Sequence, residues 1–124
     1  MLRVVHFKIA GNNPEQLAAF YAIVFGWEIT KWPGPQDYWL VKTGPAGTPG
    51  IDGAIFRPME HFVGAVNSIA VEDIDATVAK LRASGGQTVT EKSTIPGIGY
   101  QIYCKDVDGT LFGLHQNDPK AGLG

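Results

Sequence analysis

One succession of elements, a β-strand, a turn and an amphipathic helix, begins twice in this chain. The first copy, VVHFKIAGNNPEQLAAFYAIVFGW, starts at Val4, and the second, AVNSIAVEDIDATVAKLRASGGQ, starts at Ala65. Asn13 and Asp73 are suited to cap the two helices, and glycines follow both helices as stop signals. An internal duplication is therefore the feature that most constrains the fold.

Strand and turn signals complete each copy. We expect strands at 4–10, 27–32, 38–43 and 54–57 in the first copy and at 66–71, 87–91, 100–105 and 111–116 in the second. The glycine- and proline-rich stretches 44–53 and 94–99 are expected to be loops. The predicted order is βαβββ twice, with modules at 4–58 and 65–116 in a single α+β domain covering 1–124.

One helix covers only one face of a four-stranded sheet. The predicted fold is therefore a curved mixed sheet around a cavity, and the faces away from the helices line that cavity. In the first strand Val5, Phe7 and Ile9 alternate with His6 and Lys8. If the apolar set packs on the helix, His6 and Lys8 face the cavity.

Composition excludes several classes of protein. The 124 residues carry a formal net charge of −2, which gives no electrostatic footprint for nucleic acid or an anionic membrane. No apolar run is long enough to span a bilayer, and the first residues do not read as a signal peptide. The single cysteine, Cys104, excludes an intrachain disulfide, and we expect it to be a small buried apolar residue. A cytoplasmic location is the default expectation.

Several segments together resemble a known superfamily. The patterns HF-x-I, PE-x-x-x-x-FY and VFGW in the first copy, and VNSIAVEDID, IPGIGYQIYCKD and DGTLFGL in the second, resemble the vicinal oxygen chelate (VOC) superfamily, the glyoxalase/bleomycin-resistance/dioxygenase fold. They look most like an uncharacterised bacterial glyoxalase-like group within it. The resemblance implies a small-molecule ligand and a homodimer. It leaves open lyases, isomerases, dioxygenases and drug-sequestering proteins.

Metal-dependent members of that superfamily hold a divalent ion, such as iron, manganese, nickel or zinc, with His and Glu side chains from paired strands. Only His6 matches clearly. The second-module histidine falls at Asn67 or, with another anchor, at Val66, and the final-strand glutamate falls at Gly113. No Asp, Glu or His occurs at 54–57, where another ligand is expected. The family metal site is therefore predicted to be incomplete.

His115 offers a relocated ligand. It lies two residues after Gly113, so it shares a strand face with that position. His6, Asn67 and His115 would form such a set, with Glu60 or His61 nearby on a loop. If no metal binds, His6 remains a candidate general base.

The predicted substrate pocket contains polar residues from both modules. They are His6, Lys8, Asn67, Tyr100 and His115. Lys8 either binds an anionic ligand group or, as we consider more plausible from sequence, extends its ammonium to the surface. Tyr100 and Tyr103 must project to opposite faces of their strand, so at most one lines the pocket. Some of the many aromatic residues of the first module are expected on the cavity face, where they would stack on a planar ligand.

These observations predict a glyoxalase-like protein that binds a small organic molecule. The alternatives are a lyase, isomerase or dioxygenase-type enzyme with a relocated divalent metal, and a resistance-type protein that sequesters a drug.

Overall fold

The computed structural model describes residues 2–58 and 64–123 of the chain. It divides into two compact units, one spanning His6–Val66 and the other running from Asn67 onward together with the first residues of the chain. Glu60 and His61, expected near the metal site, lie outside the described residues. Among the described helices, none has the length and apolar character that crossing a bilayer requires.

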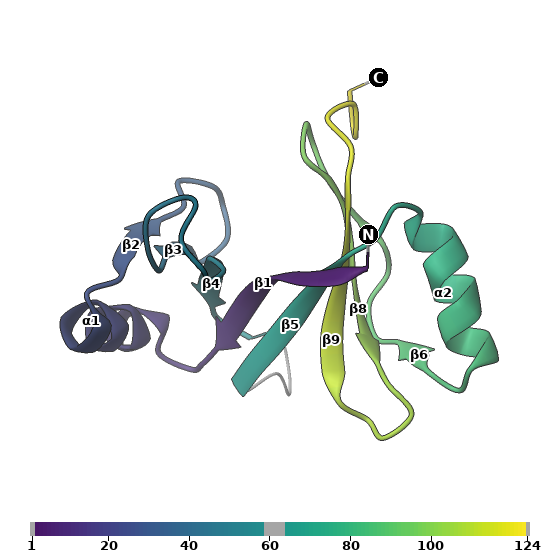
Figure 1. The fold of residues 1–124 in the computed structure, drawn as a ribbon, viewed down its shortest axis with the longest axis horizontal. Coiled ribbons are helices and arrows are strands. Elements are labelled where there is room, and N and C mark those ends of the chain that lie inside the picture. Colours follow the sequence, from purple (N-terminus) through teal and green to yellow (C-terminus); the bar gives the residue numbers. More distant parts are fainter. Residues whose placement is uncertain (1, 59–63, 124) are drawn as a thin grey trace. The chain divides into compact units, whose positions relative to one another are not determined.

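The first unit has the predicted βαβββ order (Figure 1). Its elements are β1 (Arg3–Ala10), α1 (Pro14–Phe25), β2 (Glu28–Lys31), β3 (Tyr38–Lys42) and β4 (Gly53–Phe56). The strands are ordered β2-β3-β4-β1, with β1 parallel to β4 and the other pairs antiparallel. This arrangement brings the first and last strands of the unit side by side.

The second unit repeats that pattern with one change. Its elements are β5 (Gly64–Ala70), α2 (Ile74–Ala83), β6 (Gln87–Thr88), β7 (Ser93–Ile95), β8 (Gly99–Lys105) and β9 (Leu111–Asn117). Strand β5 is parallel to β9, which is antiparallel to β8. Strands β6 and β7 both pair antiparallel with β8, so they act as two pieces of one interrupted strand.

A bulge causes that interruption. The N–H groups of Val89 and Thr90 both point to the carbonyl oxygen of Tyr103, at 2.8 and 3.4 Å. Extra residues on one strand of an antiparallel pair disrupt the ladder locally. The prediction of a continuous strand at 87–91 and of a loop from Thr94 was therefore wrong, because Ser93–Ile95 pairs with β8.

Matching caps fix the alignment of the two copies. Asn13 accepts a hydrogen bond from the N–H of Gln16 at 3.2 Å, and Asp73 accepts one from Ala76 at 3.0 Å. The caps lie sixty positions apart (73 against 13), and so do the ends of β1 and β5 (70 against 10). His6 therefore corresponds to Val66, and the alignment of His6 with Asn67 is off by one residue.

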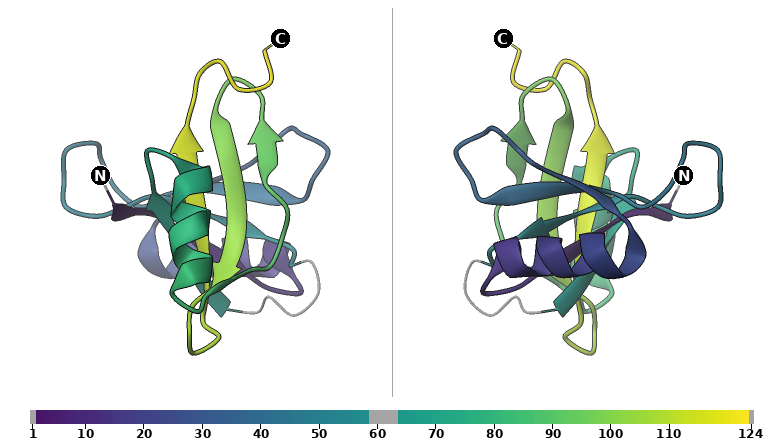
Figure 2. Two further views of the ribbon diagram at one scale, coloured as in Figure 1. Left: turned by 90° about the vertical axis from the view of Figure 1, so that its right-hand side faces the viewer. Right: turned by 90° about the vertical axis from the view of Figure 1, so that its left-hand side faces the viewer.

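Each helix covers one face of its own sheet (Figure 2). In the first unit Trp39, Val41 and Ile55 form the buried core, with Phe7, Ile9, Leu17, Ala18, Tyr21, Trp27 and Ile29 packed around them. In the second unit the core contains Val71, Ile74, Ile102, Cys104 and Leu114. Cys104 is fully buried, as expected, and burial raises the pKa of its thiol, an effect that Arg82 opposes.

The loop between β3 and β4 is closed at its base. Thr43 donates its N–H to the Asp52 carboxylate at 2.9 Å and its hydroxyl to the Ile51 carbonyl at 2.8 Å. Within the loop, the Thr48 hydroxyl donates to the Pro45 carbonyl at 2.6 Å. These contacts make a clasp that joins the ends of the two strands independently of the residues between them.

Candidate functional site

The face of the β1–β4 sheet that turns away from α1 carries the first candidate site. Phe7 and Ile9 pack into the core under α1, so the alternating residues His6 and Lys8 lie on the opposite face. Cross-strand partners share a face, which places Ala54 and Leu40 in a row with Lys8. We call this face of β1–β4 the open face.

Lys8 is the most deeply buried charged residue of that face, with only 4% of its surface exposed. Its Nζ lies 5.9 Å from the centre of the Tyr38 ring, within cation–π range. Burial lowers the pKa of Lys8 from 10.5 to about 8, because desolvation disfavours the ammonium. The prediction that Lys8 extends to the surface was therefore wrong.

Three aromatic rings surround this end of the open face. The Trp32 and Tyr38 ring centres are 6.2 Å apart, and those of Tyr38 and Phe56 are 6.3 Å apart. Phe56 and Tyr38 are cross-strand partners, so their rings share the face of Lys8. Burial also raises the pKa of Tyr38 to about 12, so its hydroxyl stays neutral. We call Trp32, Tyr38 and Phe56 the aromatic wall.

His6 lies two residues before Lys8 on the same strand face and is half-buried. This placement agrees with the alternation in the sequence. An imidazole and an ammonium therefore line one face, a combination that suits binding an anion and moving a proton.

The second unit places its predicted site residues on two different faces. Asn67 lies on the face that α2 covers. It pairs with Phe112, which in turn pairs with Cys104 of the core. Ser68 pairs with Gly113, which pairs with Tyr103, on the face away from α2. Asn67 was expected on the face away from α2 because the two copies were aligned one residue out of register. A slip of one residue exchanges the two faces of a strand.

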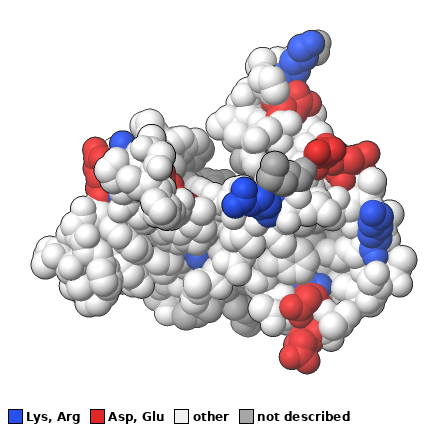
Figure 3. All heavy atoms as spheres, viewed as in Figure 1, with Lys and Arg blue, Asp and Glu red and all other residues white. Residues whose placement is uncertain are grey.

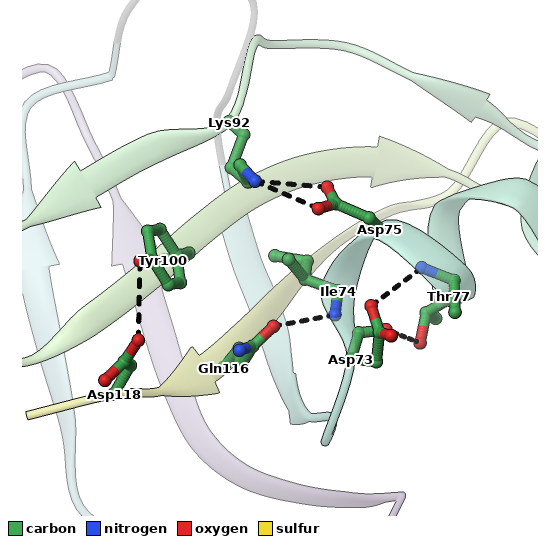
Figure 4. A network of polar contacts seen from close by, with 9 residues as sticks. Asp73, Ile74, Asp75, Thr77, Lys92, Tyr100, Gln116 and Asp118 are labelled. Atoms are coloured by element: carbon green, nitrogen blue, oxygen red, sulfur yellow. Dashed lines mark hydrogen bonds and ion pairs between the residues drawn. The ribbon is translucent and has the colours of Figure 1, made fainter. Parts of the chain in front are cut away.

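Tyr100 also belongs to the α2 side, where it packs against the core of the second unit. Its hydroxyl lies 3.4 Å from Asp118, and the Lys92 Nζ lies 5.1 Å from its ring centre. Figure 4 shows Lys92 also paired with Asp75 at the start of α2. Tyr100 thus joins parts of its own unit, and Tyr103 takes the opposite face.

His115 lies on the face away from α2, opposite Gln101, in the row next to that of Gly113 and Tyr103. Its Nε2 contacts the Asn117 amide oxygen at 2.7 Å. That contact occupies one ring nitrogen and leaves Nδ1 as the other position for a ligand.

The residues present do not fit the metal ion that the fold family uses. The positions that the resemblance assigns to its ligands hold Val66, Gly113 and the segment 54–57, and none of these residues is Asp, Glu or His. A Cβ at Gly113 would meet only ordinary contacts, 3.6 Å from Ser68 Oγ and 3.7 Å from Tyr103, so space exists there but no ligand does. Within 2–58 and 64–123, no three His, Cys, Asp or Glu side chains gather as a metal-binding group.

Each unit also has a surface hollow. One, of about 380 Å³, is lined by Ala70, Val71, Glu72 and Asn117. The other, of about 410 Å³, lies within the β3–β4 loop. Neither contains His6 or Lys8, and the chemistry of the open face carries more information about function than either hollow.

Comparison with known proteins connects this geometry to a family. The model of the Glyoxalase/Bleomycin resistance protein/Dioxygenase superfamily matches residues 3–114. The chain belongs to this superfamily. The fold and family expected from the sequence motifs are thereby confirmed.

Relatives of the chain include longer proteins. The provisionally named glyoxylase CFP32 of Mycobacterium bovis is 31% identical over 119 residues, which are 91% of this chain and 43% of that protein. CFP32 of Mycobacterium tuberculosis matches to the same extent. The chain thus spans less than half the length of these curated relatives.

Solved structures of this superfamily share the fold at low sequence identity. A methylmalonyl-CoA epimerase in complex with methylmalonyl-CoA and NH4+ has a TM-score of 0.70 and 16% identity, covering 98% of both chains. The methylmalonyl-CoA epimerase of Mycobacterium tuberculosis has a TM-score of 0.67 and 18% identity, covering 95% of this chain and 88% of that chain. At this identity the likeness shows the fold alone.

Sequence reasoning placed His6 and Lys8 on the correct strand face but missed the arrangement around them. The aromatic wall depends on the register of β3 against β4, which no short motif reveals. The sixty-residue spacing of the helix caps could have predicted that Ser68 and Tyr103 lie on the face away from α2. This spacing determines the strand faces better than matching histidine positions does.

Proposed function

We propose that the chain binds a small organic molecule with an anionic or strongly polarised oxygen on the open face of β1–β4, without the metal ion of its metal-dependent relatives. The observation that carries this proposal is Lys8, a lysine 4% exposed and set beside an aromatic wall.

The donor capacity of a buried ammonium supports a role in binding. A charged group in a poorly hydrated site gains more from a further polar contact than the same group in water. Its three N–H donors allow Lys8 to hold a ligand oxygen in addition to any contact inside the protein. A ligand carboxylate or enolate oxygen would stabilise the ammonium in this way.

The aromatic wall supports the second half of the proposal. Ligand sites combine apolar and aromatic lining with a few polar groups that fix orientation. Trp32, Tyr38 and Phe56 supply the lining, and Lys8 and His6 supply the polar groups. The ligand we expect is therefore a compact anion with a planar or apolar body.

The comparisons support a small-molecule ligand without naming it. One epimerase of the same fold was solved with methylmalonyl-CoA, a ligand with a carboxylate and a thioester. Family membership extends this to a general expectation of a small-molecule site, and the pair His6 and Lys8 supplies the polar groups that we propose for it.

The test is a thermal-shift screen of 2-oxo acids, acyl-CoA esters, glutathione hemithioacetals and planar aromatic acids. A ligand that binds only the folded state raises the apparent stability, by about 2.7 kcal/mol at one hundred times its Kd. We expect a hit to lose affinity at least about tenfold in Lys8→Met and to keep it in Lys92→Met. Lys92 is the matched control because it also lies over a tyrosine ring but on the other unit.

Two results would change the proposal. Equal binding by the wild type and Lys8→Met, with circular dichroism showing both folded, would overturn it. If the bound compound exchanges a carbon-bound proton with D2O, and His6→Gln stops this exchange while binding persists, the site is catalytic and His6 is its base.

We also propose that the chain forms a homodimer and is located in the cytoplasm. Cell fractionation tests the location, and a secreted chain would contradict it. Light scattering tests the dimer, and a one-chain mass would contradict it.

A further inference from the structure

The indole of Trp32 rests on a glycine. If Gly34 carried a Cβ, that atom would overlap three atoms of the six-membered ring of Trp32, namely Cη2, Cζ3 and Cζ2. The φ of Gly34 lies outside the left-handed region, so the backbone itself would accept another residue there. The space that the indole fills is therefore what requires a glycine at this position.

The turn that carries Trp32 is held by contacts of its own. The Trp32 N–H donates to the Tyr38 carbonyl oxygen at 2.8 Å and closes the β2–β3 hairpin. Asp37, directly before β3, pairs with Arg57 at 3.3 Å. The prolines on either side of Gly34 each have a fixed φ. None of these contacts involves the indole, so Gly34 can affect the ring without affecting the turn.

Trp32 lies at the outer end of the aromatic wall. It directly follows β2, and Lys8 lies on β1, the two outermost strands in the order β2-β3-β4-β1. The Tyr38 ring centre is 5.9 Å from Lys8 Nζ, and 6.2 Å separate the ring centres of Tyr38 and Trp32. A ligand with its anionic oxygen at Lys8 and its body on Tyr38 therefore meets Trp32 with its far end.

We propose that Gly34 is a positioning residue: by seating the Trp32 indole, it sets the length of the ligand body that the open face accepts. The proposal rests on the function proposed above and narrows the ligand class to flat aromatic acids of limited length. A seated ring limits length because a rigid ligand that overlaps it must displace it from its packing.

The surroundings of Trp32 suit an apolar end of the ligand. Trp32 is 36% exposed, so a ligand can reach its ring, and Leu40 on the same face is 46% exposed. Most of the surface of the first unit that Figure 3 shows carries no charge. An aryl group is thus a better match for this end of the face than a second charged group.

The experiment measures the Kd of benzoate, 2-naphthoate and anthracene-2-carboxylate by titration calorimetry. In this rigid series only the length of the flat body grows. For the wild type we expect the Kd of anthracene-2-carboxylate to exceed that of the best shorter acid at least about tenfold. Trp32→Ala and Gly34→Ala should each lower this ratio at least about fivefold.

Gly44→Ala is the matched control, because its Cβ would make only an ordinary contact, 3.5 Å from Thr48 Oγ1 in the β3–β4 loop. It should leave the ratio of the Kd values unchanged. Circular dichroism checks that each variant is folded. If Trp32→Ala or Gly34→Ala fails to fold, the ratio in the other variant decides.

A double variant separates positioning from a general effect on the fold. If Gly34 acts through the indole, Gly34→Ala should have no further effect on the ratio in a chain that already carries Trp32→Ala. Effects that add in the double variant would overturn the positioning role.

The same titrations distinguish this inference from the proposed function. If the acids bind and Lys8→Met removes the binding, but the wild type accepts all three equally or the variants keep its ratio, the length limit is overturned and the proposed function stands. If none of the acids binds any of the folded chains, the proposed function is overturned and the length limit with it.

Discussion

At the scale of single residues, Lys8 combines two properties that seldom occur together. It carries a charge, yet it is only 4% exposed and lies beside an aromatic ring. Alternation along β1 was enough to predict which face it occupies. Its burial could not be predicted, because Tyr38 and Phe56 reach it through strand pairings that are remote in sequence.

The lowered pKa of Lys8 predicts how stability depends on pH. The pKa of Lys8 is about 8 in the folded chain and 10.5 for the ordinary side chain. Between these values the unfolded chain keeps a proton that the folded chain has lost, so the free energy of unfolding rises with pH. Between about pH 7.5 and 9.5 we expect a gain of the order of 2 kcal/mol, measured by urea denaturation.

Lys8→Met is the control for that measurement, since it removes the titrating lysine and should abolish the rise. In this variant stability should instead fall towards the top of the range, because burial raises the pKa of the Cys104 thiol and the folded chain keeps a proton that the unfolded chain loses. Above pH 10 Tyr38 also acts against the rise, because its raised pKa of about 12 keeps a proton in the folded chain that the unfolded chain loses. Identical pH profiles for the wild type and Lys8→Met would show that Lys8 is not the group responsible.

At the scale of elements, strand β4 depends on a glycine at its first position. A Cβ at Gly53 would lie 2.5 Å from the Phe7 carbonyl oxygen and 2.6 Å from the Phe7 ring, where β1 and β4 pair. Gly53 was predicted to lie in a loop. It belongs instead to the parallel pairing of β1 with β4, which also brings Lys8 and Ala54 together.

We therefore expect Gly53→Ala to destabilise the fold by about 2 kcal/mol or more, because overpacking against backbone cannot be relieved by a side-chain rotation. Urea denaturation of the purified variant measures the change. Gly44→Ala is the matched control, since its Cβ would be 3.5 Å from Thr48 Oγ1, and a loss within about 0.5 kcal/mol is expected there. Equal losses in the two variants would contradict the account of β4.

Local signals predicted some elements much better than others. The helix caps at Asn13 and Asp73 were clear because capping depends on residues three positions apart. The bulge between β6 and β7 was missed because it depends on contacts with Tyr103 on another strand. Helix α1 is apolar on more than one side of its C-terminal half, where Phe20, Val24 and Phe25 are exposed, so periodicity alone does not reveal its outer side.

At the scale of the whole molecule, the duplication predicted the fold and the family but not the chemistry. To predict two βαβββ units with the same strand order, it is enough to recognise matching hydrophobic periodicity and matching helix caps. Both are visible in the sequence. The chemistry depends on a few side chains, and the fold tolerates many residues at positions such as Val66 and Gly113, to which the resemblance assigned metal ligands.

Val66 and Gly113 stand where the resemblance leads us to expect metal ligands. We therefore expect the purified protein to carry no stoichiometric transition metal. Elemental analysis after dialysis should find less than about 0.1 iron, manganese, nickel or zinc per chain, because one or two imidazoles without carboxylates seldom hold these ions tightly. Retention of about one ion per chain, lost in His6→Ala, would contradict this and restore the relocated set that includes His115.

The clasp between Thr43 and Asp52 has a consequence for the evolution of the chain. Because it closes the β3–β4 loop at its base, the pairing of the strands does not depend on how many residues lie between Gly44 and Ile51. Doubling the length of such a loop adds only about 0.6 kcal/mol of closure entropy. Insertions, including a whole reporter peptide, should therefore be accepted there with little loss of stability in urea denaturation.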